Sequence, residues 1–322
     1  MLTWILGGSV LFMAAFAAIT VRVGWCPSPA VAGSQLLLPW WFLLTIAVVV
    51  TTAITGTWIL AVAGVAVATG TFVVLFPKLH RSPRARPDML PEASVSVTLA
   101  NLYIDNNEPD EAINQLLDSA PDILVMTELT PDLVARFDEL GGAHRFPHRI
   151  HPEPIAGEYV VGIFTPLDML RSEVRHQGPL EVVEMDVRTR KGEELRVIAV
   201  HPEAPVGREQ FRRWRRQLHE LESILKDASA ATIVLGDLNS GTLQPPFEHL
   251  VRSPFRDAHD ELGVALKPSW GVAPWLPRWF PTLLARLDHL LVSPEVLVIE
   301  LDDLDAVGSD HRPFRANLGL TN

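Results

Sequence analysis

The stretch that decides the fold is Thr232-Ile233-Val234-Leu235-Gly236-Asp237-Leu238-Asn239. Its first four residues have the character of a buried strand, and polar side chains follow at the carboxyl end. Because side chains two apart on an extended chain point to the same side, Asp237 and Asn239 can face one reacting centre together. Gly236 allows a backbone or phosphate group to come close. Alone the motif is weak, because Asp and Asn after a strand are usually plain turn residues.

The charge of the chain is distributed unevenly. The 322 residues are 48% hydrophobic and carry a formal net charge of -11. Residues 1–87 contain no Asp or Glu and only five of the 27 basic residues, which leaves 22 basic and 38 acidic side chains, a net of −16, for the rest. This acidity argues against tight, sequence-independent binding to a nucleic-acid backbone. Cys26 is the only cysteine, which excludes a disulfide framework and a cysteine metal site.

Long uncharged runs occupy the first part of the chain. Leu2 to Val21 is long enough to cross a bilayer at about 20 residues per crossing, and it lacks the features of a removed signal peptide. Residues 36–76 are again uncharged, about twice one crossing, with turn-forming residues between Thr51 and Thr57. We therefore predict a membrane anchor, residues 1–77, with three transmembrane helices that contact the bilayer through residues 2–77. The alternative, a buried soluble core, is disfavoured because Arg22 is the only charged side chain in the segment.

A basic, proline-rich linker, residues 78–92, follows the anchor. It contains Lys78, Arg81, Arg84 and Arg86. Such a cluster just outside a membrane helix usually marks the cytoplasmic side of the membrane.

The remaining part, residues 93–322, alternates between strands and helices. Three helices are predicted in this part. One covers 109–117, a second begins after a capping residue, Thr130, and a third covers 207–226, where apolar residues recur at three- and four-residue steps. Many strands with few helices between them favour an α/β (α+β) fold, a two-sheet β-sandwich flanked by helices, over a doubly wound parallel sheet. Strands are predicted at 95–102, 122–126, 159–164, 180–187, 195–200, 232–235 and 287–292.

Polar residues stand at or near the ends of many of these strands or in short loops. Loops carried on a rigid scaffold are where catalytic groups concentrate. Each residue alone has an ordinary structural interpretation, such as a turn residue or a solvated charge, but their joint occurrence in this order is hard to assign to coincidence. The set is Asn101, Glu128, His201, Asp237, Asn239, Asp288, Asp310 and His311.

This set resembles the endonuclease/exonuclease/phosphatase superfamily, which includes DNase-I-like nucleases, inositol-polyphosphate phosphatases and neutral sphingomyelinases. The resemblance covers about residues 93–320, and its most specific motif is Ser309-Asp310-His311-Arg312-Pro313. It implies the DNase-I-like four-layer fold and hydrolysis of phosphoesters. One departure is Thr127, where many relatives have glutamine. The other matching motifs are Leu99-Ala100-Asn101, Met126-Thr127-Glu128, Val200-His201, Gly236-Asp237-Leu238-Asn239 and Arg286-Leu287-Asp288-His289.

A divalent metal ion fits the chemistry of these residues. Glu128 is a hard oxygen ligand suited to Mg²⁺ or Mn²⁺, and Asn101 and Asp310 are the candidates that complete or support the site. The ion would polarise the phosphoryl oxygen and neutralise charge that builds in the transition state.

The remaining residues have predicted catalytic roles. Asp237 orients or deprotonates the attacking water, and Asn239 donates to a phosphoryl oxygen. His311 requires a partner that fixes its tautomer and holds it charged, and Asp288 is the candidate. His201 supports the phosphate or the leaving group. Direct displacement by water is expected, without a Ser or Cys nucleophile.

Two further stretches bear on the substrate. The loop Pro268 to Pro281 is rich in Trp and Pro, and it either grips an apolar tail or packs locally. Five arginines between Arg208 and Arg216 crowd the start of the helix 207–226. A solvated helix face is our preferred interpretation of them, and contact with lipid phosphates is the alternative.

We interpret the chain as a membrane-anchored, metal-dependent phosphohydrolase or phosphodiesterase. Three membrane helices ahead of such a domain look like a bacterial group that includes the teicoplanin-resistance membrane proteins. That resemblance implies a multi-pass protein of the cell membrane, an extracytoplasmic catalytic domain and a lipid-linked or envelope phosphate as substrate. The basic linker favours the opposite orientation. The alternative functions are a metal-dependent nuclease, disfavoured by the acidic domain, and a catalytically silent binding module of the same fold.

Overall fold

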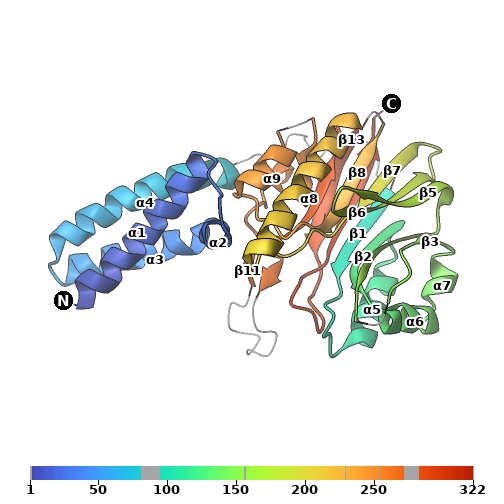
Figure 1. The fold of residues 1–322 in the computed structure, drawn as a ribbon, viewed down its shortest axis with the longest axis horizontal. Coiled ribbons are helices and arrows are strands. Elements are labelled where there is room, and N and C mark those ends of the chain that lie inside the picture. Colours follow the sequence, from blue (N-terminus) through green and yellow to red (C-terminus); the bar gives the residue numbers. More distant parts are fainter. Residues whose placement is uncertain are drawn as a thin grey trace.

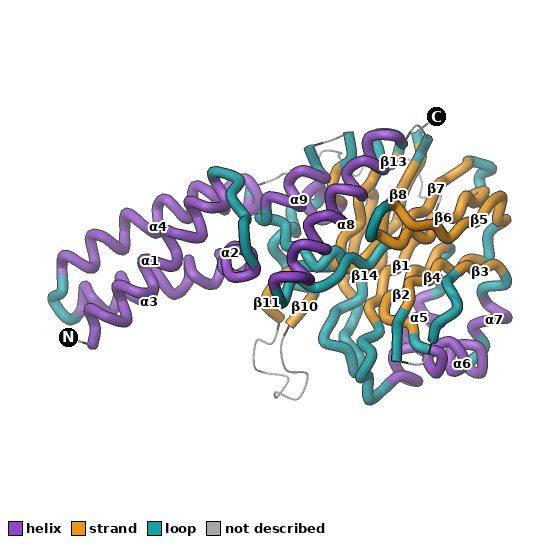
Figure 2. Tube along the Cα trace, in the orientation of Figure 1, coloured by secondary structure: helices purple, strands orange, loops and turns teal. Residues whose placement is uncertain are grey.

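The chain folds into a helical bundle joined to a two-sheet domain (Figure 1). The computed structural model describes residues 2–80, 95–155, 157–228, 230–252, 254–271 and 283–321. Helices α1 (Leu2–Arg22), α3 (Leu38–Ile54) and α4 (Trp58–Leu79) form the bundle, which projects from one end of the domain. The short helix α2 (Pro29–Leu36) lies where the bundle meets the domain (Figure 2).

The bundle contains two to three candidate membrane spans. Within residues 2–80, Thr3–Arg22 and Trp58–Leu79 are long and apolar enough to cross a membrane. The pair α2 and α3, bent by 64° at its break, supplies a third span if it counts as one. The break between α3 and α4 falls at residues 55–57, within the predicted turn. Large apolar side chains such as Ile19, Ile54 and Val62 point outward from the bundle, as a lipid environment requires.

Two six-stranded mixed sheets form the domain. The pairs β1–β2 and β7–β8 are parallel, and the other neighbouring strands of both sheets are antiparallel. The first sheet has the order β13 (Val296–Asp303), β14 (Phe314–Leu320), β1 (Val95–Asn101), β2 (Ile123–Leu129), β4 (Val160–Thr165), β3 (His148–Ile150). The second has the order β5 (Asp168–Gln177), β6 (Leu180–Arg188), β7 (Glu194–Ala199), β8 (Thr232–Asp237), β12 (Asp288–Val292), β9 (Arg256–Asp257). A separate short ribbon joins β10 (Trp270–Gly271) to β11 (Leu283–Ala285).

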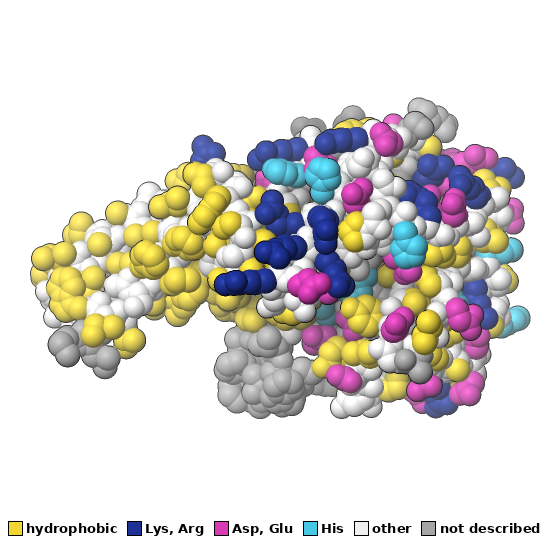
Figure 3. Space-filling model, in the orientation of Figure 1, with side chains coloured by type: hydrophobic (Ala, Val, Ile, Leu, Met, Phe, Trp, Pro, Cys, Tyr) yellow, Lys and Arg dark blue, Asp and Glu magenta, His cyan; other side chains and the backbone are white. Residues whose placement is uncertain are grey.

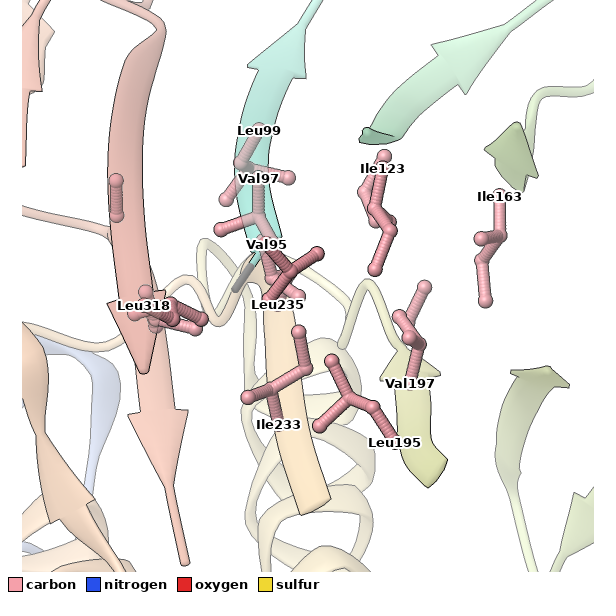
Figure 4. Packing of buried hydrophobic residues seen from close by; sticks show 14 of the residues in the cluster. Val95, Val97, Leu99, Ile123, Ile163, Leu195, Val197, Ile233, Leu235 and Leu318 are labelled. Carbon is pink, nitrogen blue, oxygen red and sulfur yellow. The ribbon is translucent and has the colours of Figure 1, made fainter. Parts of the chain in front are cut away.

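Helices cover the outer face of each sheet. The two inner faces meet in a core of aliphatic side chains that includes Val97, Leu99, Val197 and Leu235 (Figure 4). Helices α5 (Pro109–Ser119) and α6 (Pro131–Glu139) pack on the first sheet, followed by the single turn α7 (Gly142–Arg145). Helices α8 (Arg208–Asp227) and α9 (Pro245–Leu250) pack on the second sheet, and α10 (Ala258–Glu261) follows β9. The predicted two-sheet sandwich flanked by helices is confirmed.

The bundle is fastened to the domain by buried contacts. The side chain of Lys78, near the end of α4, is about 90% buried and lies 3.1 Å from Oδ2 of Asp260 and 3.2 Å from Oε1 of Glu248. The indole of Trp40 donates to the carbonyl of Leu284 at 2.9 Å. Bundle residues, among them Leu38 and Leu75, share an apolar cluster with Leu243 of the domain. The predicted linker, residues 78–92, lies outside the described residues from position 81 onward.

Candidate active site

The parallel strand pairs bring the predicted polar residues to one edge of the sandwich. Parallel neighbours end at the same edge, so β1 and β2 place Asn101 and Glu128 together, and β8 places Asp237 opposite them. The amide Nδ2 of Asn101 donates to Oε1 of Glu128 at 2.9 Å and to Oδ2 of Asp237 at 3.1 Å. One buried amide therefore connects the functional ends of the two sheets.

Glu128 is held in an unusual backbone conformation. Its φ is +58°, in the left-handed region that non-glycine residues rarely adopt, and the pairing of β2 with β4 is irregular between Met126 and Leu129. In this conformation the glutamate carboxylate lies beside Asn101 at the end of β1, where its Oε1 accepts a hydrogen bond. Its second oxygen accepts from the backbone N–H of Ile104 at 2.8 Å.

Asp237 and Asn239 form a hydrogen-bonded turn at the end of β8. The backbone N–H of Asn239, whose φ is +48°, donates to Oδ1 of Asp237 at 2.8 Å. The amide Nδ2 of Asn239 donates to the carbonyl of Pro202 at 2.9 Å and lies 3.3 Å from Nε2 of His201. The role of Gly236 is also clear: a Cβ there would lie 1.9 Å from the carbonyl oxygen of Val200. The close approach that the glycine permits is therefore to protein backbone.

Two histidines flank the buried Asp237 carboxylate. Nε2 of His201 and Nε2 of His311 each lie 3.5 Å from its Oδ2. Burial alone would raise the pKa of Asp237, but the charges of His311 and His201 hold it well below the usual range. Burial would lower the pKa of His201, yet its contact with Asp237 raises it. Asp237 is thus ionised and both rings are stabilised as cations.

His311 has the predicted partner. Its Nδ1 lies 2.8 Å from Oδ2 of Asp288, which also accepts from the hydroxyl of Ser269 at 2.6 Å. Burial lowers the pKa of His311, but the carboxylates of Asp288 and Asp237 outweigh it and raise the pKa to about 10. Because Nδ1 is engaged with Asp288, Nε2 is the atom that faces the reacting centre.

Asp310 stands at the rim of this group. Its Oδ2 accepts from the indole N–H of Trp270 at 3.1 Å, whereas its buried Oδ1 has no hydrogen-bond partner among the described residues. Burial raises the pKa of Asp310, and the charges of Glu128 and Asp237 raise it further against the lowering effect of His311. Negative charge is therefore concentrated here, and His311, whose Nε2 lies 4.0 Å from Oδ1, compensates only part of it.

The site opens into a cleft of about 690 Å³. Apart from Asn101 and Asp288, which lie beneath its surface, the predicted residues line it. The unexpected part of the lining is α2, which contributes Pro29, Ala30, Gly33 and Leu36 as an apolar wall opposite the strand ends. One wall of the cleft thus comes from the segment between two candidate membrane helices.

The residues of the cleft fit a divalent metal ion. Glu128, His201 and Asp237 offer ligand atoms that lie within 4.8 Å of one another. The carboxylates of Glu128, Asp237 and Asp310 line the same cleft and are hard oxygen ligands of the kind that Mg²⁺ and Mn²⁺ prefer, whereas His201, held as a cation, offers no lone pair to an ion.

A second buried cluster lies behind the site. Asp257, His259 and His289 are completely enclosed and could by distance also hold an ion. However, Nη1 of Arg286 lies 2.7 Å from Nε2 of His259, so this ring nitrogen is already engaged with a guanidinium group and is not available to a metal ion. His289 Nε2 donates to the carbonyl of Ser240 at 2.9 Å. We interpret the cluster as a hydrogen-bonded support for the strand end that carries Asp288.

Several cleft residues were missed from the sequence. Tyr103 and Tyr159 line the cleft, Ser269 supports Asp288, and α2 supplies a wall. No motif marks them, because their positions depend on loops and on a helix distant in the sequence. Trp270, in the loop for which the sequence left open gripping an apolar tail or packing locally, lines the cleft and donates to Asp310. The loop's other tryptophans, at positions 275 and 279, lie outside the described residues.

Comparison with known proteins identifies the fold family. A family model described as Endonuclease/Exonuclease/phosphatase family matches residues 99–311. The chain belongs to this family. Its members are metal-dependent phosphoester hydrolases, and the chain is an enzyme of this class. The predicted family membership is thus confirmed, whereas a comparison with curated protein sequences gives no significant match.

Solved structures of the family share the fold. D. rerio TDP2, complexed with a single strand DNA product, is 17% identical with a TM-score of 0.56, and the match covers 70% of this chain and 98% of that one. The human Nocturnin catalytic domain, with a bound sulfate anion, is 17% identical with a TM-score of 0.55, covering 74% and 100%. A family member from Beutenbergia cavernae is 16% identical with a TM-score of 0.57, covering 71% and 72%. These likenesses establish the two-sheet fold.

Proposed function

We propose that the chain is a membrane-anchored phosphohydrolase or phosphodiesterase that cleaves a lipid-linked or envelope phosphate by direct attack of water. The observation that carries this proposal is the apolar wall of α2 beside the catalytic cleft. A polar phosphoester would lie at the strand ends, and an apolar tail would run along α2 toward the membrane helices.

Glu128 and Asp310 would hold the metal ion, with Asn101 positioning Glu128 through its amide. When bound, Mg²⁺ or Mn²⁺ would supply Lewis-acid polarisation of the phosphoryl oxygen. Oδ1 of Asp310 supports this assignment, because it is buried, accepts no hydrogen bond among the described residues and has only the 4.0 Å contact with Nε2 of His311.

Asp237 is the proposed base that orients the attacking water and takes its proton. As the water oxygen bonds to phosphorus, the ester P–O bond breaks, and the charge accumulating on the phosphoryl oxygens is stabilised by His311 and Asn239. His201, held as a cation beside Asp237, is placed to donate a proton to the leaving oxygen. Asp288 keeps Nδ1 of His311 occupied and its ring charged.

The proposed location is the cell membrane, with the catalytic domain on the extracytoplasmic side, as in the bacterial group that the chain resembles. Lys78, one of the basic residues that favour the opposite orientation, is ion-paired with Asp260 and Glu248 inside the protein. Its charge is therefore neutralised locally, which weakens the argument from the basic linker.

The test uses the full chain in mixed micelles. A long-chain lipid phosphate and a short, water-soluble phosphoester with the same headgroup are compared, each with Mg²⁺ and with excess chelator. Two variants of α2 form a matched pair, because a Cβ at Gly33 would meet nothing within 4 Å. Gly33→Ala should preserve hydrolysis of the lipid substrate, and Gly33→Glu should reduce it at least tenfold while the soluble ester is affected much less. Faster cleavage of single- or double-stranded DNA than of the lipid phosphate would instead establish a nuclease.

A further inference from the structure

A second hollow lies at the start of α2 and is lined by arginines. It has a volume of about 1070 Å³ and runs between the segment Pro27–Pro29 and the first turns of α8. We call it the arginine groove. Arg208, Arg212, Arg215 and His219 follow one another at steps of four, three and four residues, so they share one face of the helix, and Arg216 lies beside them.

These arginines lack the carboxylate partners that α8 provides elsewhere. Lys226 pairs with Glu222 at 2.7 Å, and Arg213, off the groove, lies 3.2 Å from Glu209. Among the described residues, no carboxylate lies within ion-pair distance of the four groove arginines. Glu209 and Glu220 also line the groove, but the four arginines outnumber these two carboxylates, so the net charge of the groove remains positive. In a domain with a net charge of −16, this is an exceptional concentration of positive charge.

The groove lies where the domain meets the candidate membrane helices. Its second wall, Pro27–Pro29, comes five residues after α1 ends at Arg22. Between them, Trp25 is 51% exposed, as expected for an indole at the level of lipid headgroups. Figure 3 shows the basic side chains gathered at the border between the apolar bundle and the domain. The exposed guanidinium groups would therefore lie next to the surface of a bilayer that α1 crosses.

We propose that the arginine groove binds the headgroup phosphates of anionic phospholipids in the leaflet next to the domain. Guanidinium groups bind phosphate oxygens in bidentate geometry, and several in one groove favour an anionic surface over a zwitterionic one. An extended nucleic acid is disfavoured, because it would pass from the groove onto the acidic remainder of the domain. The proposal concerns membrane binding and does not depend on which phosphoester the cleft hydrolyses.

Binding of a fluorescent phosphatidylglycerol by the full chain in detergent micelles tests this directly. A phosphatidylcholine with the same acyl chains is the zwitterionic reference. The wild type should bind phosphatidylglycerol more tightly, and raising the salt concentration should reduce the difference. Each arginine near a membrane surface is expected to contribute about fivefold in affinity, so Arg212→Gln with Arg215→Gln should weaken phosphatidylglycerol binding about 25-fold. Phosphatidylcholine binding should not change.

The matched control is Arg145→Gln with Arg188→Gln, which removes two exposed arginines distant from the groove. It should bind phosphatidylglycerol like the wild type. Circular dichroism should show all three proteins folded, because every substituted residue is exposed. Equal affinities of the groove variant and the wild type would overturn the proposal. So would displacement of the lipid by inorganic phosphate or a short oligonucleotide at the concentrations at which phosphatidylglycerol itself binds.

Discussion

Gly236→Ala should destabilise the protein, because β7 and β8 are too close for any side chain there. The added Cβ would lie 1.9 Å from the carbonyl oxygen of Val200, so the strands must separate by about 1 Å or more to restore a van der Waals contact. Overpacking of this kind costs about 1–3 kcal/mol. The separation also strains the hydrogen bond from Val200 N–H to Leu235 O, now 3.2 Å, worth about 1 kcal/mol.

The free energy of unfolding of Gly236→Ala should therefore be about 3 kcal/mol lower than that of the wild type, which corresponds to a decrease in Tm of about 6–12 °C. Thermal unfolding of the full chain in detergent, followed by circular dichroism, measures it. Hydrolysis should fall as well. His201 follows β7 and Asp237 ends β8, so separating these strands would move the two side chains apart. The control is Gly70→Ala, because a Cβ at that position in α4 meets nothing within 4 Å, and alanine favours helix. A Tm for Gly236→Ala within about 1 °C of the wild type would refute the reasoning.

Three further predictions concern the metal, the histidine pair and acid stability. Glu128→Ala should lower turnover at least 100-fold without altering the circular dichroism spectrum, and the wild type should lose activity in excess chelator; full activity in chelator would contradict the metal assignment. Asp288→Asn and His311→Ala should be strongly non-additive in single-turnover kinetics, because the residues act as one unit; losses that multiply would show independent roles. Burial, followed by the charge of Arg286, lowers the pKa of His259 to about 4. As pH falls from 6.5 toward 4, the unfolded chain therefore binds a proton at this histidine that the folded chain does not, so the contribution of His259 to stability should fall, with a limiting slope of about 1.4 kcal/mol per pH unit. The raised pKa values of His201 and His311 act in the opposite direction near neutral pH, so the measurement compares the wild type with His259→Gln. In denaturant titrations at pH 7, 6 and 5, the wild type should lose stability relative to the variant as pH falls; a constant difference between the two would reject it.

The sequence predicted well the elements with the strongest apolar patterns, although it missed β13 (Val296–Asp303) and β14 (Phe314–Leu320) of the first sheet. The strand at 232–235 and the helix at 207–226 appear as β8 (Thr232–Asp237) and α8 (Arg208–Asp227). Their apolar residues recur with the period of the element, and both are packed on one side by the core. Strand β5 (Asp168–Gln177) was missed because it is a mostly exposed edge strand, so charged residues stand where an alternating apolar pattern would be expected.

The sequence predicted which polar residues form the site, but it did not predict the shape of the cleft around them. Residues at strand ends, such as Asn101 and Glu128, meet because the parallel neighbours β1 and β2 end at one edge, and that follows from the element order. The pairing of His311 with Asp288 followed from the need of a buried imidazolium for a carboxylate. The position of α2 could not be predicted, because it depends on long-range packing against the domain. Its contacts include the hydrogen bond from Gln244 to the carbonyl of Ala32, residues 212 apart in the chain.

The wall that α2 contributes to the cleft makes the N-terminal helical bundle a part of the enzyme. A Cβ at Gly241 would lie 2.4 Å from the side chain of Leu36, so the bundle and the catalytic loops are fitted to each other at the level of single atoms. A bundle of this kind cannot be exchanged for that of another protein in the way that a simple tether can. A chimera with foreign N-terminal helices would retain every strand-end residue and still lack one side of its substrate site. We therefore expect substitutions in α2 and in the loop after β8 to be inherited together during evolution.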